Sequence, residues 1–178
     1  MPVVYTYFTV TGNFQVLQTD LTDAGGEPDF GQITGLVTFT PLVTAPEAKT
    51  STPLTTVLLQ PILGRIEEDG KLKTLDSAPL YYMSGSTRNL CPANTTPVFV
   101  NGNPAYWVSS TGVQTANPAG TPTYGVRLVA NSAVLGLTAL PYRVDFSKVI
   151  YDGSPKTLPS FTFNAPATDV EIDVVNLA

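Results

Sequence analysis

Short runs of alternating apolar and polar residues, closed by proline or glycine, recur along the chain. In residues 160–164 (SFTFN) and 169–174 (DVEIDV) every second side chain is apolar, and Ala165 and Pro166 separate the two runs. This period of two places alternate side chains on opposite faces of a strand, whereas a helix needs a period near 3.6 residues. The pattern predicts an all-β chain, folded as an antiparallel β-sandwich or an open barrel.

The composition favours strands in the same way. The 178 residues include 16 prolines and 14 glycines, and only 13% are charged, about half the usual share. Threonine and valine are abundant, whereas the good helix formers lysine and glutamate are scarce. This length and composition predict one β domain over residues 1–178.

Local signals predict where the strands turn. Residues 64–72 (GRIEEDGKL) predict a hairpin, because the Asp-Gly pair within them tolerates the positive φ of a tight turn. Residues 20–32 and 44–55 are rich in Asp, Gly, Pro or Thr and predict loops. Residues 130–140 are the one stretch where a short helix is expected, although Gly136 weakens that expectation.

The middle of the chain differs from the rest. Residues 84–124 hold many turn-forming residues and few charges, and two apolar runs lie inside them, at 98–100 and 106–108. A segment of this length and composition is too long for an ordinary connection between strands. We therefore expect 84–124 to be a long, loop-rich central excursion inserted in the β domain.

Several classes of chemistry find little support in the sequence. The chain has no histidine, which removes the usual general base near neutral pH and the commonest zinc ligand. Its single cysteine, Cys91, excludes an internal disulfide and a thiolate cluster. The net charge is −5 and no basic run occurs, which argues against a nucleic-acid partner. We expect no enzymatic activity, no catalytic or metal-binding residues, no cofactor, no secretory signal and no membrane insertion.

Two acidic groups are candidates for a site. Glu67, Glu68 and Asp69 are adjacent in the expected hairpin turn, where carboxylates do not face each other across a cleft as glycosidase pairs do. The second group lies in the 20–32 loop, where oxygen-rich side chains surround two glycines and calcium is an alternative to a plain acidic surface. Its members are Asp20, Asp23, Glu27 and Asp29.

Aromatic residues are the candidates for an interface. Tyr81 and Tyr82 are adjacent, so in a strand one of them should face outward, and Tyr106 and Trp107 repeat this arrangement in the excursion. Such pairs either fill the core or anchor a protein interface, and stacking on sugar rings is a further alternative. The candidate interface residues are Tyr81, Tyr82, Phe99, Tyr106 and Trp107.

Six phrases carry a resemblance to a known family. They are Val10–Phe14 (VTGNF), Gly35–Pro41 (GLVTFTP), Leu63–Leu72 (LGRIEEDGKL), Tyr142–Phe146 (YRVDF), Leu158–Pro166 (LPSFTFNAP) and Val170–Val174 (VEIDV). In this order they resemble the small β-rich domains of minor tail proteins in siphophages of actinobacteria. Phrases such as G-x-V-T-F also occur in carboxypeptidase-regulatory and immunoglobulin-like modules. The resemblance covers most of the chain except residues 84–124.

The resemblance implies a non-enzymatic virion protein at the tail tip or tail fibre. Such a protein is assembled in the host cytoplasm, joins other virion proteins, and works in several copies as a homo-oligomer, a ring or a trimer, in contact with the host surface. Two alternatives stay open. One is a head decoration or head-tail connector protein, and the other is a carbohydrate-binding module on a tail fibre that takes a host cell-wall glycan.

Overall fold

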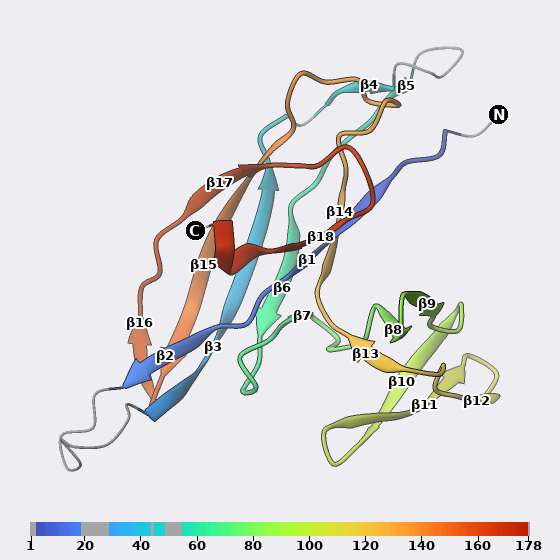
Figure 1. Cartoon of the computed structure of the whole chain (residues 1–178), viewed down its shortest axis with the longest axis vertical. Coiled ribbons are helices and arrows are strands. Elements are labelled where there is room, and N and C mark those ends of the chain that lie inside the picture. The colour runs from blue at the N-terminus through green and yellow to red at the C-terminus, as the bar shows by residue number, and fades with distance from the viewer. Residues whose placement is uncertain (1–2, 19–28, 44, 49–54, 178) are drawn as a thin grey trace.

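The chain is built almost entirely of β-strands (Figure 1). The structure is a computed structural model that describes residues 3–18, 29–43, 45–48 and 55–177. In these ranges the regular helical structure is one 3-10 turn, η1 (Val174–Leu177), and the strands form no closed barrel. The expected all-β fold class is confirmed.

A seven-stranded antiparallel sheet forms the larger layer of the body. Its strands run in the order β16-β15-β3-β6-β7, with β17 also paired to β15 and β2 also paired to β3. Their bounds are β2 (Gln15–Gln18), β3 (Asp29–Pro41), β6 (Ile62–Ile66), β7 (Leu72–Thr74), β15 (Pro141–Tyr151), β16 (Ser154–Lys156) and β17 (Phe161–Asn164). The longest pairing joins β3 to β15, from Pro41 opposite Tyr142 to Ile33 opposite Tyr151.

A three-stranded sheet forms the second layer. It consists of β14 (Val126–Val129), β1 (Tyr7–Thr11) and β18 (Glu171–Asp173), with β14 antiparallel and β18 parallel to the central β1. The two layers share one core, in which the Phe8 ring lies 6.2 Å from that of Tyr142. At Gly64 a Cβ would lie 2.8 Å from Val126 Cγ2, so the layers meet there only because the residue is glycine.

A separate lobe interrupts the body between β7 and β14. We call residues 81–123 the central lobe; Figure 1 shows it at the lower right, beside the body. One lobe sheet has the order β13-β8-β9 and the other the order β10-β11-β12. The strands are β8 (Tyr81–Ser84), β9 (Thr87–Leu90), β10 (Thr95–Val100), β11 (Asn103–Ser109), β12 (Gln114–Ala116) and β13 (Thr121–Thr123).

Turn residues in the central lobe reverse the chain between short strands. Between β10 and β11, Asn101 and Gly102 have φ values of 51° and 77°. Two positive φ values in a two-residue connection are typical of the turn that matches the twist of antiparallel strands. Most of the 84–124 segment, which we expected to be loop-rich, therefore lies in β9–β13 and the turns between them.

Three local expectations were wrong. The expected 44–55 loop contains the strand β4 (Glu47–Ala48), which pairs with β5 (Thr55–Thr56) at the end of that range. The expected helix at 130–140 is a single turn, in which Leu135 N and Gly136 N both donate to Ser132 O, at 3.1 and 3.0 Å. Gly136 then takes a φ of 56°, which ends the turn. The expected 20–32 loop is also too long at its end, because β3 already begins at Asp29.

The hairpin expected at 64–72 is confirmed. β6 and β7 pair from Ile66 opposite Leu72 to Gly64 opposite Thr74. Gly70 has a φ of 75° in the connection. A smaller two-stranded pair, β4 (Glu47–Ala48) and β5 (Thr55–Thr56), lies at the far end of the body in Figure 1.

Candidate interaction surface

The five candidate interface aromatics lie in the central lobe at different depths. Tyr81, Tyr82 and Trp107 are buried, with 3%, 2% and 3% of their surface exposed. Tyr106 is half-buried and Phe99 is 37% exposed. Of the five, Phe99 therefore exposes the largest share of its surface, whereas the three buried rings pack within the chain.

Both tyrosines of β8 are buried because this strand is covered on both faces. β8 is the middle strand of its sheet, between β13 and β9. The Tyr81 hydroxyl donates to Glu171 Oε2 of the body at 3.1 Å, so this side chain points to the body. Tyr82 lies beside Trp107 of the other lobe sheet, and burial raises its pKa. Adjacent residues of one strand thus contribute to two different packing layers.

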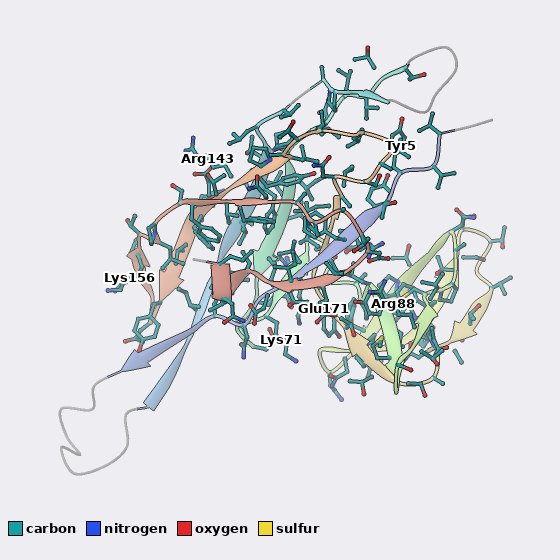
Figure 2. All side chains as sticks on the ribbon, turned by 45° about the horizontal axis from the view of Figure 1, so that its top comes forward. Tyr5, Lys71, Arg88, Arg143, Lys156 and Glu171 are labelled. Carbon is teal, nitrogen blue, oxygen red and sulfur yellow. The ribbon has the colours of Figure 1, made fainter. Side chains whose placement is uncertain are left out.

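A polar cluster joins the central lobe to the body. We call Tyr81, Arg88, Arg127, Asp169 and Glu171 the junction cluster. Arg88 of β9 and Arg127 of β14 contact the two oxygens of Asp169 at 2.9 and 2.8 Å, and the Arg88 guanidinium lies 4.7 Å from the centre of the Tyr81 ring. Figure 2 shows Arg88 beside Glu171 at this junction, with Arg143 and Lys156 on other parts of the body.

The charges of the junction cluster stabilise one another. The hydrogen bond from Arg127 is the main cause that lowers the pKa of Asp169, against a smaller opposing effect of burial, and Arg88 adds to it. Burial raises the pKa of Tyr81, and the neighbouring Glu171 carboxylate raises it further. The cluster therefore holds an ionised Asp169 and a neutral Tyr81 near neutral pH.

A shallow cleft of about 590 Å³ lies over the β6–β7 hairpin, and the central lobe contributes one residue to its lining. Its lining includes Arg65, Glu67 and Lys73 of the body, Lys148 at the irregular part of β15, and Gly102 from the tip of the β10–β11 hairpin. The lobe thus reaches the body at this cleft as well as at the junction cluster.

Glu67 is the centre of the charged groups in this cleft. It accepts hydrogen bonds from Arg65 and Ser77, and Lys73 Nζ lies 2.9 Å from both Glu67 Oε2 and Asp69 Oδ2. Burial opposes ionisation of Glu67, but the hydrogen bonds from Ser77, Lys73 and Arg65 outweigh it and lower its pKa from 4.5 to about 2. Two cations and two carboxylates balance, so this group is suited to holding the hairpin in place.

The surface of the central lobe carries almost no charge. Residues 89–126 contain no Asp, Glu, Lys or Arg, so nearly the whole lobe lacks the charges that supply the net −5 of the chain. Large apolar side chains are exposed on it, namely Leu90, Phe99, Val100 and Val113. Depletion of charge is typical of surfaces that become buried against a partner. The length of this charge-free run is a further sequence signal, beyond the aromatic residues, from which the lobe surface could have been found.

The acidic loop weighed as a calcium site lies mostly outside the described residues. Asp20, Asp23 and Glu27 fall there, and Asp29 begins β3. Across the described ranges, no three His, Cys, Asp or Glu side chains gather closely enough to hold a metal ion. Cys91 is half-buried, its thiol donates to the Pro79 carbonyl at 3.3 Å, and burial raises its pKa.

Neither a membrane-spanning helix nor a known relative gives a further indication of function. In the part of the chain that the structure describes, no helix is long and apolar enough to cross a bilayer. No protein-family model, curated protein or solved structure matches the chain.

Proposed function

We propose that this chain is a non-enzymatic structural protein of a phage virion, a minor tail component at the tail tip or fibre. In this role the sandwich body is the scaffold, and the central lobe buries its uncharged surface against neighbouring virion proteins, with the host surface as a further contact. The driving force is burial of apolar area, about 25 cal/mol per Å², less the cost of ordering the partners.

The observation that carries the proposal is the division of the chain into body and lobe. The six phrases that resemble phage tail domains all lie outside residues 84–124. They coincide with, or directly flank, strands of the body: β1, β3, β6, β7, β15, β17 and β18. In this proposal the two-layered body is the unit that resembles the family, and the central lobe is an addition to it with a surface of different chemistry.

Localisation on the particle tests the proposal. Antibodies raised against the purified chain would be applied to particles of the phage that encodes it, and the particles imaged by electron microscopy. We expect label at the tail tip or fibre. Label on the capsid or at the neck would replace the tail assignment with the head decoration or connector alternative. A chain missing from purified particles would overturn the virion role itself.

Removal of the central lobe tests the mechanism. Leu80 N donates to Thr123 O at 2.8 Å, so the two ends of the lobe meet at its base and Leu80 can be joined to Tyr124 by a short glycine linker. We expect this variant to keep the β circular-dichroism spectrum of the body but to be lost from particles. Normal incorporation of the lobeless chain would contradict the assembly role of the lobe.

The glycan-binding alternative has its own test. Trp107, the strongest candidate for stacking on a sugar, is buried beside Tyr82, so it offers no open platform in this structure. Binding of the purified chain to host cell-wall polysaccharide, lost in Phe99→Ala but kept in Val113→Ala, would favour a carbohydrate-binding module over pure assembly.

A further inference from the structure

Each of the two sheets of the central lobe ends in two outer strands, and each outer strand has one edge that pairs with no strand of its own sheet. These edges belong to β13 and β9 in one sheet and to β10 and β12 in the other. An unpaired edge offers free backbone N–H and C=O groups to any other strand, and proteins usually protect such edges with proline, charge or a bulge. A lobe edge that lacks all of these features is therefore the one left open to a partner.

Three of the four edges are protected. β13 contains Pro122, which has no N–H to donate, and β9 carries Arg88, which is held in the junction cluster. β10 contains Pro97 and a register shift between Val98 and Phe99. By contrast, β12 has the sequence Gln-Thr-Ala, without proline or charge, and all three of its residues are exposed.

The free backbone groups of β12 can be assigned from its pairing with β11. Ser109 N donates to Val113 O at 3.0 Å, so the groups of Val113 face β11. Along an antiparallel strand the backbone N–H and C=O groups of successive residues point alternately to one neighbour and to the other. Thr115, two residues after Val113, lies opposite Trp107 of β11. The N–H and C=O of Thr115 therefore face β11, whereas those of Gln114 and Ala116 face outward.

Hydrogen bonds at both ends hold this edge in place. Before β12, Gly112 N donates to Ser109 O at 3.0 Å and Val113 N donates to Ser109 Oγ at 3.1 Å. After it, Asn117 Nδ2 donates to Pro104 O at 2.8 Å. The edge is thus ordered before any partner arrives, which lowers the entropic cost of pairing.

We propose that the β12 edge pairs with β12 of a second copy of this chain, antiparallel across a two-fold axis at Thr115. Gln114 of each copy then exchanges two backbone hydrogen bonds with Ala116 of the other, and the two threonines face each other at the close, non-hydrogen-bonded position. Threonine pairs are favourable there. The two β10-β11-β12 sheets become one six-stranded sheet.

The distribution of charge favours a second copy as the occupant. The strand pairs with itself without any like-charge contact, because residues 89–126 are uncharged. The net charge of −5 lies on the rest of the chain, so contact through the central lobe brings two neutral surfaces together and keeps the charged bodies apart. The exposed Val113 adds apolar surface next to the paired strands. A two-fold pair closes on itself, so a ring or trimer would need a second surface.

The inference deepens the proposed assembly role, and its test uses the purified full-length chain, so its outcome is independent of particle localisation. Sedimentation velocity over a concentration series from micromolar to millimolar should show a monomer–dimer equilibrium. Gln114→Pro removes an outward N–H and keeps the β11 pairing, so it should weaken the dimer about tenfold, since each copy loses one backbone bond. Gln114→Ala keeps that N–H and should dimerise like the parent chain.

A charge swap tests the two-fold axis itself. Thr115→Lys alone and Thr115→Glu alone place like charges opposite each other and should weaken dimerisation, whereas an equimolar mixture of the two should restore it as a heterodimer. Circular dichroism of each variant checks that the fold is kept. A chain that stays monomeric at millimolar concentration, a dimer unaffected by Gln114→Pro, or a mixture without restored dimer would each overturn the proposal.

Discussion

At the scale of single residues, one carboxylate organises the charges at the turn between β6 and β7. Glu67 stands at the end of the β6–β7 hairpin and gathers Arg65, Lys73 and Ser77 around one carboxylate. From the sequence alone, adjacent acids in a turn indicate a solvated surface. The sequence does not show that Arg65 and Lys73 of the paired strands lie beside the Glu67 carboxylate. Arg65 and Lys73 are eight residues apart in sequence, and they become neighbours only through the register of the hairpin.

The lowered pKa of Glu67 predicts a specific loss of stability in acid. Folding lowers this pKa from 4.5 to about 2, so the ionised carboxylate stabilises the folded state fully above about pH 5, and this contribution is lost as the pH falls towards 2. Glu67→Gln should therefore reduce the free energy of unfolding by about 1–2 kcal/mol at pH 7, after allowance for screening, and by much less near pH 2. Chemical unfolding of both proteins from pH 2 to 7 measures the difference.

The neighbouring glutamate provides the control for this prediction. Glu68 is exposed in the same turn, so Glu68→Gln changes the net charge equally without touching Arg65 or Lys73. A difference between parent and Glu67→Gln that stays constant across the pH range would contradict the assigned role of the carboxylate.

At the scale of elements, strands with clean alternation could be predicted and strands made of turn formers could not. The hairpin at 64–72 and the strands near 142–146 and 160–164 follow from alternation and an Asp-Gly turn. Inside 84–124 the same residue types that predict loops supply the turns of a compact lobe, because strands of three to seven residues leave a large share of the segment to turns. The short strands of that lobe have no long apolar period to reveal them.

For the candidate surface, the sequence indicated the segment but not the exposure of each side chain. Adjacent aromatics directed attention to the central lobe, but the depth of each ring depends on which sheet covers it. Tyr81 is buried by the body and Tyr82 by the second lobe sheet, and both contacts join residues distant in sequence. No local pattern in the sequence carries that information.

The turn at the tip of the β10–β11 hairpin gives a prediction at this scale. Gly102 has a φ of 77°, and a Cβ added there would meet nothing within 4 Å, so the cost of a side chain is purely conformational. Gly102→Ala should destabilise the hairpin by about 1 kcal/mol, whereas Gly102→Asn should cost less, because asparagine tolerates this conformation. Amide hydrogen exchange should show faster exchange in β10 and β11 for the alanine variant, with the body unchanged. Equal exchange in the two variants would be evidence against a backbone origin.

At the scale of the whole molecule, the body and the central lobe are stabilised in different ways. The two sheets of the body share one apolar core, whereas the sheets of the lobe are not extensions of either body sheet. The junction cluster links the two parts through side chains, mainly around Asp169. Charged contacts at a surface are screened by salt, so the placement of the lobe should be more sensitive to conditions than the fold of either part.

Asp169→Ala tests this separation of placement from folding. The change leaves Arg88 without its carboxylate and leaves Tyr81 and Glu171 as the remaining junction contact, so we expect the lobe to sample other orientations while both parts stay folded. Residual dipolar couplings should then fit the body and the lobe only with separate alignment tensors, while the free energy of unfolding of the body changes by less than about 1 kcal/mol. Asp145→Ala is the matched control, since it breaks an exposed pair with Arg143, 3.0 Å apart, on the body alone. A single tensor for Asp169→Ala would contradict the assigned role of Asp169 in placing the lobe, and two tensors for Asp145→Ala would show that the effect is not specific to the junction.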